Sequence, residues 1–501
     1  LFQDPALQNT ALNRLMRLSQ LFALCGTSQS LTDDPDILAV TADSRQAGPG
    51  TLFFALRGAK QDGSVFIPQA VSQGAAAVIV DQETARPDSA VPVIIRRDAK
   101  HLLACMASAL AGPQPSCIAA ITGTNGKSST ADFLRQLWIL QGNRAASLGT
   151  LGLISDTDVP APPSLTTPDP VSLSRTLAAL ARNGVEHVAL EASSHGLEQH
   201  RLDGVTLTAA GFSNLTRDHL DYHLTLEAYR AAKLRLFDEV LPTGGIAAVN
   251  ADMDSETFSA LQDIAARRSL KLRSVGRNGT TLRLIEARPT PSGQILRLAL
   301  HGEELPEISL SLPGRFQADN VMLAAAMCWQ DDADARQVVA LLPCLTGVHG
   351  RCERAVALPN GAAAYVDYAH TPDALDCVLS SLRPHTAGRL VVVFGAGGDR
   401  DRGKRPLMGA VAARMADLAI VTDDNPRTEE PSSIRSEILA ACPDALEIAD
   451  RRSAIAAGLE ALQPGDILVV AGKGHEQGQI VGTDILPFDD RLVIRELAGA
   501  A

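Results

Sequence analysis

Short apolar runs alternate with amphipathic segments along most of this chain, and polar, glycine-rich loops follow the runs. The runs have the length of buried strands, and the segments between them have helical spacing. From Cys117 to about Leu345, and again to the end of the chain, this alternation predicts parallel sheets with crossover helices. Ligands bind beyond the carboxyl ends of such strands, so a site is expected in the loops that follow them.

Three regions separate on this pattern, as the length of 501 residues also suggests. Residues 1–112 combine short strands with Gly and Pro turns and predict a smaller α/β domain. Residues 113–346 begin with the predicted linker Pro113-Gln-Pro115 and end near a helix that contains Asn320–Met327. Gly347–Arg351 predicts a hinge, and residues 347–501 predict a third α/β domain.

Composition narrows the class of protein. A net charge of −12 and only 4% aromatic residues disfavour binding to nucleic acid or to an anionic membrane. Apolar runs such as Leu390–Phe394 are too short to cross a membrane, so we expect no membrane insertion. The first residues, with Asp4, do not match a secretion signal. The cysteines contain no CxxC pair and are expected to be reduced, mostly buried thiols of a cytoplasmic protein.

A phosphate-binding loop is predicted after the first strand of the central region. The apolar run Cys117–Ile121 leads into Thr122-Gly-Thr-Asn-Gly-Lys-Ser-Ser129 and then into an amphipathic helix. Glycines let backbone amides approach an anion, Lys127 can neutralise β- and γ-phosphates, and the Ser128 hydroxyl can bind Mg²⁺. The full pattern has a glycine where Ile121 stands, so the alternative is a tight turn with a surface lysine. The strand and helix on either side favour nucleotide binding.

Two further strands of the central region lead into acidic and histidine residues. One ends at Glu191, and the other leads into a loop that contains His219. If both strands flank the phosphate strand, Glu191 and His219 lie near the phosphates and could hold a second divalent ion. On spacing alone, it is more common for His219 and His223 to cap or salt-bridge one helix.

Two other residues of the central region are ambiguous by pattern. Asn250 follows the predicted strand Gly245–Val249 and is another polar strand end. Lys233 lies in a helical segment, and its pattern alone indicates a solvated lysine.

Four predicted strands of the last region each lead into a charged loop. Arg400 and Arg427 suit bidentate recognition of carboxylates, and Asp424 and Glu476 could receive an ammonium group. Solvated loops with internal salt bridges are the alternative, but four such loops in one domain favour a pocket for a zwitterion. No GxGxxG motif is present, so a dinucleotide site is not predicted. The strands are Ala363–Val366, Leu390–Phe394, Leu418–Thr422 and Ile467–Ala471.

Over nearly its whole length the sequence resembles the Mur ligases of peptidoglycan synthesis, and in particular those that add 2,6-diaminopimelate. The resemblance implies an α/β fold with three domains: an N-terminal UDP-substrate domain, a central P-loop ATP-binding domain with a parallel or mixed sheet, and a C-terminal Rossmann-like amino-acid domain. The motifs are Gly123-Thr-Asn-Gly-Lys127, Glu191-Ala-Ser-Ser-His195, Asp218-His-Leu-Asp-Tyr-His223, Ala232-Lys233 with Leu236-Phe237, Gly350-Arg351 and Asp424-Asn-Pro-Arg427.

The resemblance also implies site residues. Lys127, Lys233, Glu191 and His219 would be catalytic, with Ser128, Glu191 and His219 as Mg²⁺ ligands and Lys233 carbamylated. The implied ATP contacts are Gly123, Thr124, Asn125, Gly126, Lys127, Ser128, Ser129, Asn250, Arg351 and Asp367. The implied contacts of the UDP substrate are Ser44, Thr166, Thr167, Ser193, Gln199 and Arg201. Those of meso-diaminopimelate are Arg400, Asp424, Asn425, Pro426, Arg427, Gly472 and Glu476.

The activity that follows from the resemblance is ATP-dependent amide formation in a monomer. The γ-carboxylate of UDP-N-acetylmuramoyl-L-Ala-D-Glu becomes an acyl phosphate, and the amine of meso-diaminopimelate attacks it. Arg427 can pair with the far carboxylate of diaminopimelate, which lysine lacks.

Three alternatives stay open. The chain could add lysine or polyglutamate, it could be a P-loop NTPase that regulates a partner, or it could bind a UDP-sugar or amino acid without catalysis.

Overall fold

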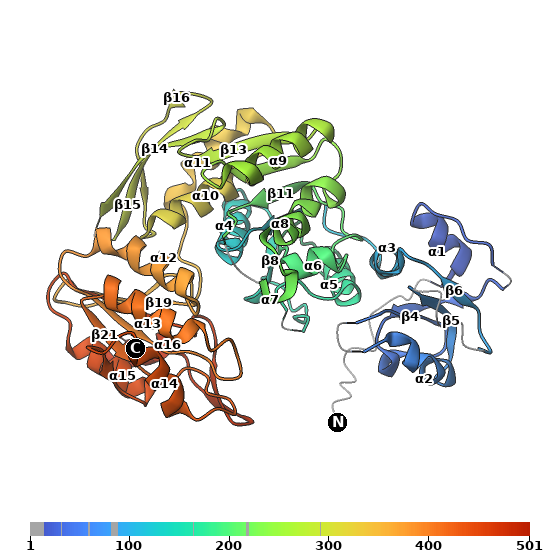
Figure 1. The fold of residues 1–501 in the computed structure, drawn as a ribbon. Helices are drawn as coiled ribbons and strands as arrows, with labels where there is room; N and C mark the ends of the chain where they lie inside the picture. The colour runs from blue at the N-terminus through green and yellow to red at the C-terminus, as the bar shows by residue number, and fades with distance from the viewer. Residues whose placement is uncertain are drawn as a thin grey trace. The chain divides into compact units, whose positions relative to one another are not determined.

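The computed structural model describes residues 15–500, apart from residues 32, 59–60, 82–88, 164, 217–219 and 291 and the side chains of Leu220 and Asp221. It is an α/β protein with several sheets, shown in Figure 1. The chain forms two compact units, and each is described by itself. The first extends to Val249 and includes Met253–Arg273, and the second contains Asn250–Asp252 and the chain from Ser274 onward.

The first unit begins with a parallel sheet in the order β3-β4-β5-β6. Leu52 and Phe54 of β4 face a core with helices α1 and α3, whereas Phe53 faces a second core with α2. This alternation explains why the strand is apolar throughout. The elements are β1 (Met16–Arg17), α1 (Leu18–Leu24), β2 (Asp36–Ile37), β3 (Ala39–Thr41), β4 (Thr51–Ala55), α2 (Ile67–Ser72), β5 (Ala75–Val80), β6 (Val93–Ile95) and α3 (Ala99–Ala111).

The first unit also contains five parallel strands of a larger, 11-stranded mixed sheet, in the order β12-β11-β7-β10-β8, with β9 antiparallel at its edge. Strand β7 lies between β10 and β11, as the predicted site required. The elements are β7 (Cys117–Thr122), α4 (Lys127–Leu140), β8 (Ala145–Gly149), β9 (Gly152–Ile154), α5 (Pro170–Arg182), β10 (His187–Glu191), α6 (Ser194–Glu198), β11 (Ala209–Phe212), α7 (Leu220–His223), α8 (Leu226–Arg235), β12 (Ile246–Asn250) and α9 (Ser255–Arg267).

The second unit starts with an antiparallel hairpin of β14 and β15, to which β16 and β17 add. The sequence pattern does not separate this hairpin from the alternating elements before it. Helix α10 is buried along most of its length and contains the predicted Asn320–Met327. Strand β13 (Lys271–Gly276) begins in the first unit and ends in the second. The other elements are β14 (Leu282–Thr290), β15 (Gly293–Leu300), β16 (Glu303–Glu304), β17 (Ile308–Leu310), α10 (Arg315–Cys328) and α11 (Ala335–Ala340).

A further sheet of this unit has the order β18-β19-β23-β20-β21-β22, in which β18 alone pairs antiparallel among the described strands. Its inner strands are wholly buried, as their apolar runs predict. The elements are β18 (Glu353–Ala357), β19 (Ala363–Asp367), α12 (Pro372–Leu382), β20 (Leu390–Phe394), α13 (Lys404–Met415), β21 (Leu418–Val421), α14 (Pro431–Leu439), β22 (Leu446–Glu447), α15 (Arg451–Glu460), β23 (Ile467–Ala471), β24 (Gly478–Val481), β25 (Asp484–Pro487) and α16 (Asp490–Leu497).

Two whole-chain expectations can be compared with the fold. Within the described ranges, no helix is both long and apolar enough to cross a membrane. All eight cysteines are free thiols, of which Cys117, Cys328, Cys352 and Cys442 are buried and Cys344 is exposed. The domain boundaries at residues 112/113 and 346/347 stay predictions.

Candidate active site

The phosphate loop lies where β7 ends between its two neighbours. Gly123 and Gly126 have φ values of 138° and 87°, which are left-handed conformations that favour glycine. A Cβ on Gly123 would lie 2.0 Å from the Ser213 Oγ atom, so this residue must be glycine for packing as well. Helix α4 begins directly after Gly126 without a side-chain cap at that residue, and helix N-termini that follow such glycine loops commonly bind anions.

The loop is held from one side by the segment that follows β11. The backbone N–H of Thr124 donates to the Asn214 carbonyl at 2.8 Å, and that of Asn125 donates to Asn214 Oδ1 at 2.9 Å. Ser213 Oγ donates to the Asn125 carbonyl at 2.5 Å. Because these contacts fix the backbone before any ligand binds, the loop is pre-organised for an anion.

Two lysines bring positive charge to the same carbonyl of this loop. Lys127 Nζ donates to the Gly123 and Thr124 carbonyls at 3.0 and 2.8 Å. Lys233 Nζ donates to the Gly123 carbonyl at 2.8 Å, lies 4.4 Å from the centre of the Tyr229 ring and is only 1% exposed. The pattern-based interpretation of Lys233 as a solvated lysine is therefore wrong, because α8 packs this face against the loop.

Glu191 lies at the end of β10, in register with Ile121 just before the phosphate loop. Its carboxylate is buried and accepts hydrogen bonds from the Thr150 amide at 2.8 Å and the Thr150 hydroxyl at 3.2 Å. A Cβ on Gly149 would lie 2.1 Å from Glu191 Oε1. The end of β8 thus cradles this carboxylate beside the loop.

Of the other two predicted metal ligands, Ser128 and His219, the structure describes only Ser128. Ser128 lies in the first turn of α4 and is buried. His219 lies outside the described residues. His223 ends α7, and its Nδ1 atom is 3.8 Å from Glu198 Oε2.

A cavity of about 1260 Å³ lies in the first unit and contains some of the predicted substrate residues. Gln199 and Arg201 line it together with Asp43, Lys100 and Arg175. Five basic and three acidic residues line this cavity, although the whole chain is acidic. The balance suits an anionic ligand of the size of a nucleotide-linked sugar.

Several predicted substrate residues do not line the cavity but make hydrogen bonds within the protein. Thr167 Oγ1 donates to the Glu191 carbonyl at 2.7 Å and accepts from the Ser193 amide at 2.9 Å. Thr166 Oγ1 lies 3.0 Å from the Thr150 hydroxyl. Ser44 is buried, and its hydroxyl donates to Gln69 Oε1 at 2.9 Å.

In the second unit, the loops after β21 and β23 meet around one buried lysine. Lys473 is fully buried, and its Nζ donates to Asn425 Oδ1 and to the Gly478 carbonyl, both at 2.8 Å. Asn425 Nδ2 in turn donates to Glu476 Oε2 at 2.9 Å. Asp424 Oδ1 lies 3.5 Å from Lys473 Nζ. Burial raises the pKa of Glu476 and lowers that of Lys473.

Arg427 has a strained backbone that its neighbours hold in place. Its φ of 53° is uncommon for a residue with a side chain. The Arg427 amide donates to the Ile480 carbonyl at 3.1 Å, and the Gly482 amide donates to the Arg427 carbonyl at 2.7 Å. Hairpin β24–β25 therefore fixes the backbone position from which the Arg427 side chain extends. Strain that the surroundings hold in this way is typical of ligand sites.

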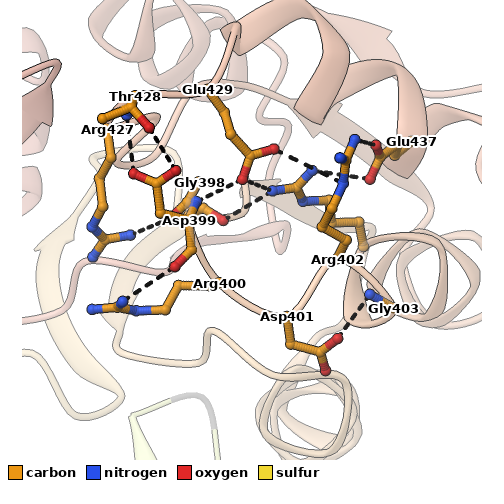
Figure 2. A network of polar contacts seen from close by, with 12 residues as sticks. Gly398, Asp399, Arg400, Asp401, Arg402, Gly403, Arg427, Thr428, Glu429 and Glu437 are labelled. Atoms are coloured by element: carbon orange, nitrogen blue, oxygen red, sulfur yellow. Dashed lines mark hydrogen bonds and ion pairs between the residues drawn. The ribbon is translucent and has the colours of Figure 1, made fainter. Parts of the chain in front are cut away.

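The loop after β20 supplies the second predicted arginine. Figure 2 shows Arg400 and Arg427 extending to one side of this loop, where Arg427 Nη1 donates to the Gly398 carbonyl at 2.8 Å and Arg400 Nη1 to the Asp399 carbonyl at 3.2 Å. On its other side the Asp399 amide donates to Glu429 Oε1 at 2.6 Å. Hydrogen bonds from Arg405 and from the Asp399 amide lower the pKa of Glu429 to about 2.

The remaining predicted residues also lie in the second unit. Arg351 stacks over Tyr368, 4.5 Å from its ring centre. Asp367 accepts from the Cys352 and Ala369 amides at 2.6 and 2.8 Å, and burial raises its pKa although Arg351 opposes this. Asn250 Oδ1 accepts from the Asp252 amide at 2.9 Å.

Gly472 and Pro426 belong to the loops around Lys473. A Cβ on Gly472 would lie 3.1 Å from Asp424 Oδ2. The Pro426 carbonyl packs closely on Gly398, where an added Cβ would lie 1.9 Å from its oxygen. The sequence analysis does not identify Lys473 as a site residue, although it includes Gly472 and Glu476 of the same loop. A lysine between two glycines after a buried strand was the available signal.

Comparison with known proteins gives the family. The chain matches the models of the Mur ligase family catalytic domain over residues 36–111, the Mur ligase middle domain over 121–328, and the Mur ligase glutamate ligase domain over 350–474. A relative from Caulobacter vibrioides named UDP-N-acetylmuramoyl-L-alanyl-D-glutamate–2,6-diaminopimelate ligase is 52% identical over 95% of this chain and 97% of its own. One from Brucella melitensis with that name is 48% identical over 95% and 96%.

Solved structures agree with the sequence comparison. A structure of a UDP-N-acetylmuramoyl-L-alanyl-D-glutamate–2,6-diaminopimelate ligase has a TM-score of 0.71 and 33% identity, and covers 97% of this chain and 99% of that one. A folylpolyglutamate synthase of Mycobacterium tuberculosis complexed with ADP and AMPPCP shares the fold, with a TM-score of 0.59 and 18% identity over 78% of this chain and 92% of that one. This chain belongs to the Mur ligase family.

Proposed function

We propose that the chain is an ATP-dependent ligase that joins meso-2,6-diaminopimelate to the D-glutamyl γ-carboxylate of UDP-N-acetylmuramoyl-L-Ala-D-Glu. The observation that carries this proposal is the pre-organised phosphate loop with two lysines and a buried glutamate beside it. The protein that contains this loop resembles, over nearly its full length, enzymes named for this reaction. Because the reaction consumes ATP and a nucleotide-linked precursor, we infer that it runs in the cytoplasm.

Phosphoryl transfer is the first step of the proposed reaction. The γ-carboxylate attacks the γ-phosphorus of ATP, ADP leaves, and an acyl phosphate forms. The ammonium group of Lys127 exchanges the Gly123 and Thr124 carbonyls for phosphate oxygens and offsets their charge. The amides at the start of α4 bind the same oxygens.

Amide formation is the second step. The amine of diaminopimelate attacks the acyl carbon, phosphate leaves, and the nitrogen loses a proton. Asp424 and Glu476 receive the substrate's ammonium group, and Arg427 pairs with the carboxylate that lysine would lack. An amino acid without that carboxylate would leave Arg427 unpaired, which costs binding energy.

The donor set near the loop fits Mg²⁺. Glu191 and Ser128 offer oxygen atoms, the ligand type that Mg²⁺ prefers, and the missing Cβ of Gly149 leaves room for the Glu191 carboxylate. We propose Ser128, Glu191 and His219 as its protein ligands. When bound, Mg²⁺ would neutralise charge on the transferring phosphoryl group.

We also propose that Lys233 carries a carbamate. Its amine is buried at the phosphate loop, where a second cation is already present. A carbamate would turn one of these cations into an anion that helps to position Mg²⁺. Protein equilibrated with ¹³C-bicarbonate should give a carbamate resonance that is lost in Lys233→Met, and the same signal in both would contradict this assignment.

The test of the function is phosphate release with ATP, Mg²⁺ and UDP-N-acetylmuramoyl-L-Ala-D-Glu, with meso-diaminopimelate or L-lysine added in parallel. Turnover is expected with diaminopimelate only, and Arg427→Ala should remove that preference. Turnover with lysine alone would contradict the specificity. ATP hydrolysis independent of both acceptor and amino acid would instead favour a regulatory NTPase.

A further inference from the structure

A thiol, an imidazole and a carboxylate form a relay in the first unit that the proposed ligase reaction does not use. Cys105 Sγ lies 3.4 Å from His101 Nε2, one helical turn away on α3. His101 Nδ1 lies 2.8 Å from Asp203 Oδ2, which comes from the segment after α6. A buried carboxylate on Nδ1 keeps the proton there and aims Nε2 at the thiol, as in activated cysteine sites.

The carboxylate of this relay is fixed as an anion. Asp203 Oδ2 also lies 2.7 Å from Arg235 Nη2 and 2.8 Å from His200 Nδ1. Although burial opposes it, the hydrogen bonds from His101, His200 and Arg235 hold the pKa of Asp203 well below its usual range. Arg235 Nη2 is 2.8 Å from His200 Nδ1 as well, so a guanidinium already stands where a metal ion bound by these side chains would lie.

A second thiol adjoins the first. Cys25 directly follows α1, which packs against α3 in the same core, and both cysteines are half-buried. The neighbouring Cys25 thiol, followed by the contact with His101, lowers the pKa of the Cys105 thiol to about 5 despite burial. The hydrogen bond to Asp203 and then that to Cys105 raise the pKa of His101 to about 10.

We propose that Cys105 is a reactive thiolate that hydrogen peroxide or an organic peroxide oxidises, and that Cys25 then closes a disulfide with it. This inference does not depend on the proposed ligase function. It rests on the placement of Cys105, His101 and Asp203 and on the neighbouring Cys25.

The chemistry balances in two steps. The Cys105 sulfur attacks one peroxide oxygen, an S–O bond forms, the O–O bond breaks, and the leaving oxygen takes the His101 proton to give water or an alcohol. The sulfur is oxidised to a sulfenic acid, and the peroxide is reduced. Cys25 then attacks the Cys105 sulfur, the S–S bond forms, the S–O bond breaks, and hydroxide leaves with the Cys25 proton as water.

Alkylation by iodoacetamide, followed residue by residue with peptide mass spectrometry, tests the thiolate. The thiolate fraction of an ordinary cysteine falls about tenfold per pH unit below its pKa. We expect the Cys105 rate to change less than about threefold between about pH 6 and pH 8. His101→Gln should restore the steep dependence at Cys105 and leave the rate at the exposed Cys344 unchanged. A Cys105 rate that rises tenfold per pH unit in the native protein would overturn the proposal.

Peroxide treatment tests the second step. The native protein should lose the mass of two hydrogen atoms, and peptide mapping should join Cys25 to Cys105. Cys25→Ser should instead accumulate a Cys105 sulfenic acid that a dimedone probe captures, and Cys105→Ser should do neither. Both variants should still unfold cooperatively and keep native phosphate release, because neither thiol is in the proposed ligase site. A disulfide that excludes Cys105, or the same mass loss in Cys105→Ser, would refute the site.

Discussion

At the scale of single residues, the proposed amino-acid site of the second unit is organised around the buried ammonium group of Lys473. Lys473 is fully buried and fixes both the orientation of the Asn425 amide and, through it, the position of Glu476. A buried ammonium group is costly unless it is hydrogen-bonded. Its place among Asp424, Asn425 and Glu476 therefore points to a positioning role for the proposed amino-acid pocket.

Lys473→Met keeps most of the side-chain volume and removes the donor. Asn425 Oδ1 would keep the Ile480 amide as a donor but lose its charged hydrogen bond, which is worth about 1.5–3 kcal/mol, so we expect the KM for meso-diaminopimelate to rise roughly tenfold to a hundredfold. The KM for ATP should not change. Steady-state kinetics check this, with exposed Lys271→Met as the matched control. Equal changes in both KM values would mean that Lys473 is merely structural.

At the scale of elements, the buried strands could be predicted from the sequence, but the exposed hairpin and the long-range contacts around them could not. Leu390–Phe394 and Ile467–Ala471 match β20 and β23 end for end, because a strand buried on both faces is a continuous apolar run. The β24–β25 hairpin is largely exposed and has no such run, yet it holds Arg427. Lys473 was missed for a similar reason: its partner Asn425 is 48 residues away, and sequence pattern does not encode that contact.

The junction of β8 and β10 gives a prediction at this scale. Gly149→Ala would place a Cβ 2.1 Å from Glu191 Oε1 and push the carboxylate away from the phosphate loop. Misplacement of a catalytic group by about 1 Å can cost roughly a hundredfold, so phosphate release should fall by about that factor. Gly48→Ala, where nothing lies within 4 Å of the new Cβ, should leave the rate unchanged. Near-native turnover by Gly149→Ala would show that Glu191 tolerates displacement.

At the scale of the molecule, charge is distributed unevenly. The chain carries a net charge of −12, but basic residues outnumber acidic ones around the large cavity. An acidic surface discourages polyanions in general, while the cavity can still take a small anion. Asp203 follows Arg201, which lines this cavity, by two residues. Its carboxylate contacts His101 on α3, His200 in the loop after α6, and Arg235 on α8. One carboxylate thus couples elements that carry Lys100 of the cavity wall and Lys233 of the phosphate site.

This coupling predicts how stability depends on pH. The hydrogen bond to Asp203, followed by that to Cys105, raises the pKa of His101 from 6.5 to about 10. Because the folded value is the higher one, the stabilisation is complete below the unfolded value and is lost as the pH rises toward about 10. His101→Gln should therefore lower the Tm by a few degrees at about pH 6 and by progressively less up to about pH 10. Since His101 is 42% exposed, added salt should shrink the difference at pH 6. Differential scanning calorimetry of both proteins across this range checks the prediction, and a Tm difference that stays constant with pH would contradict it.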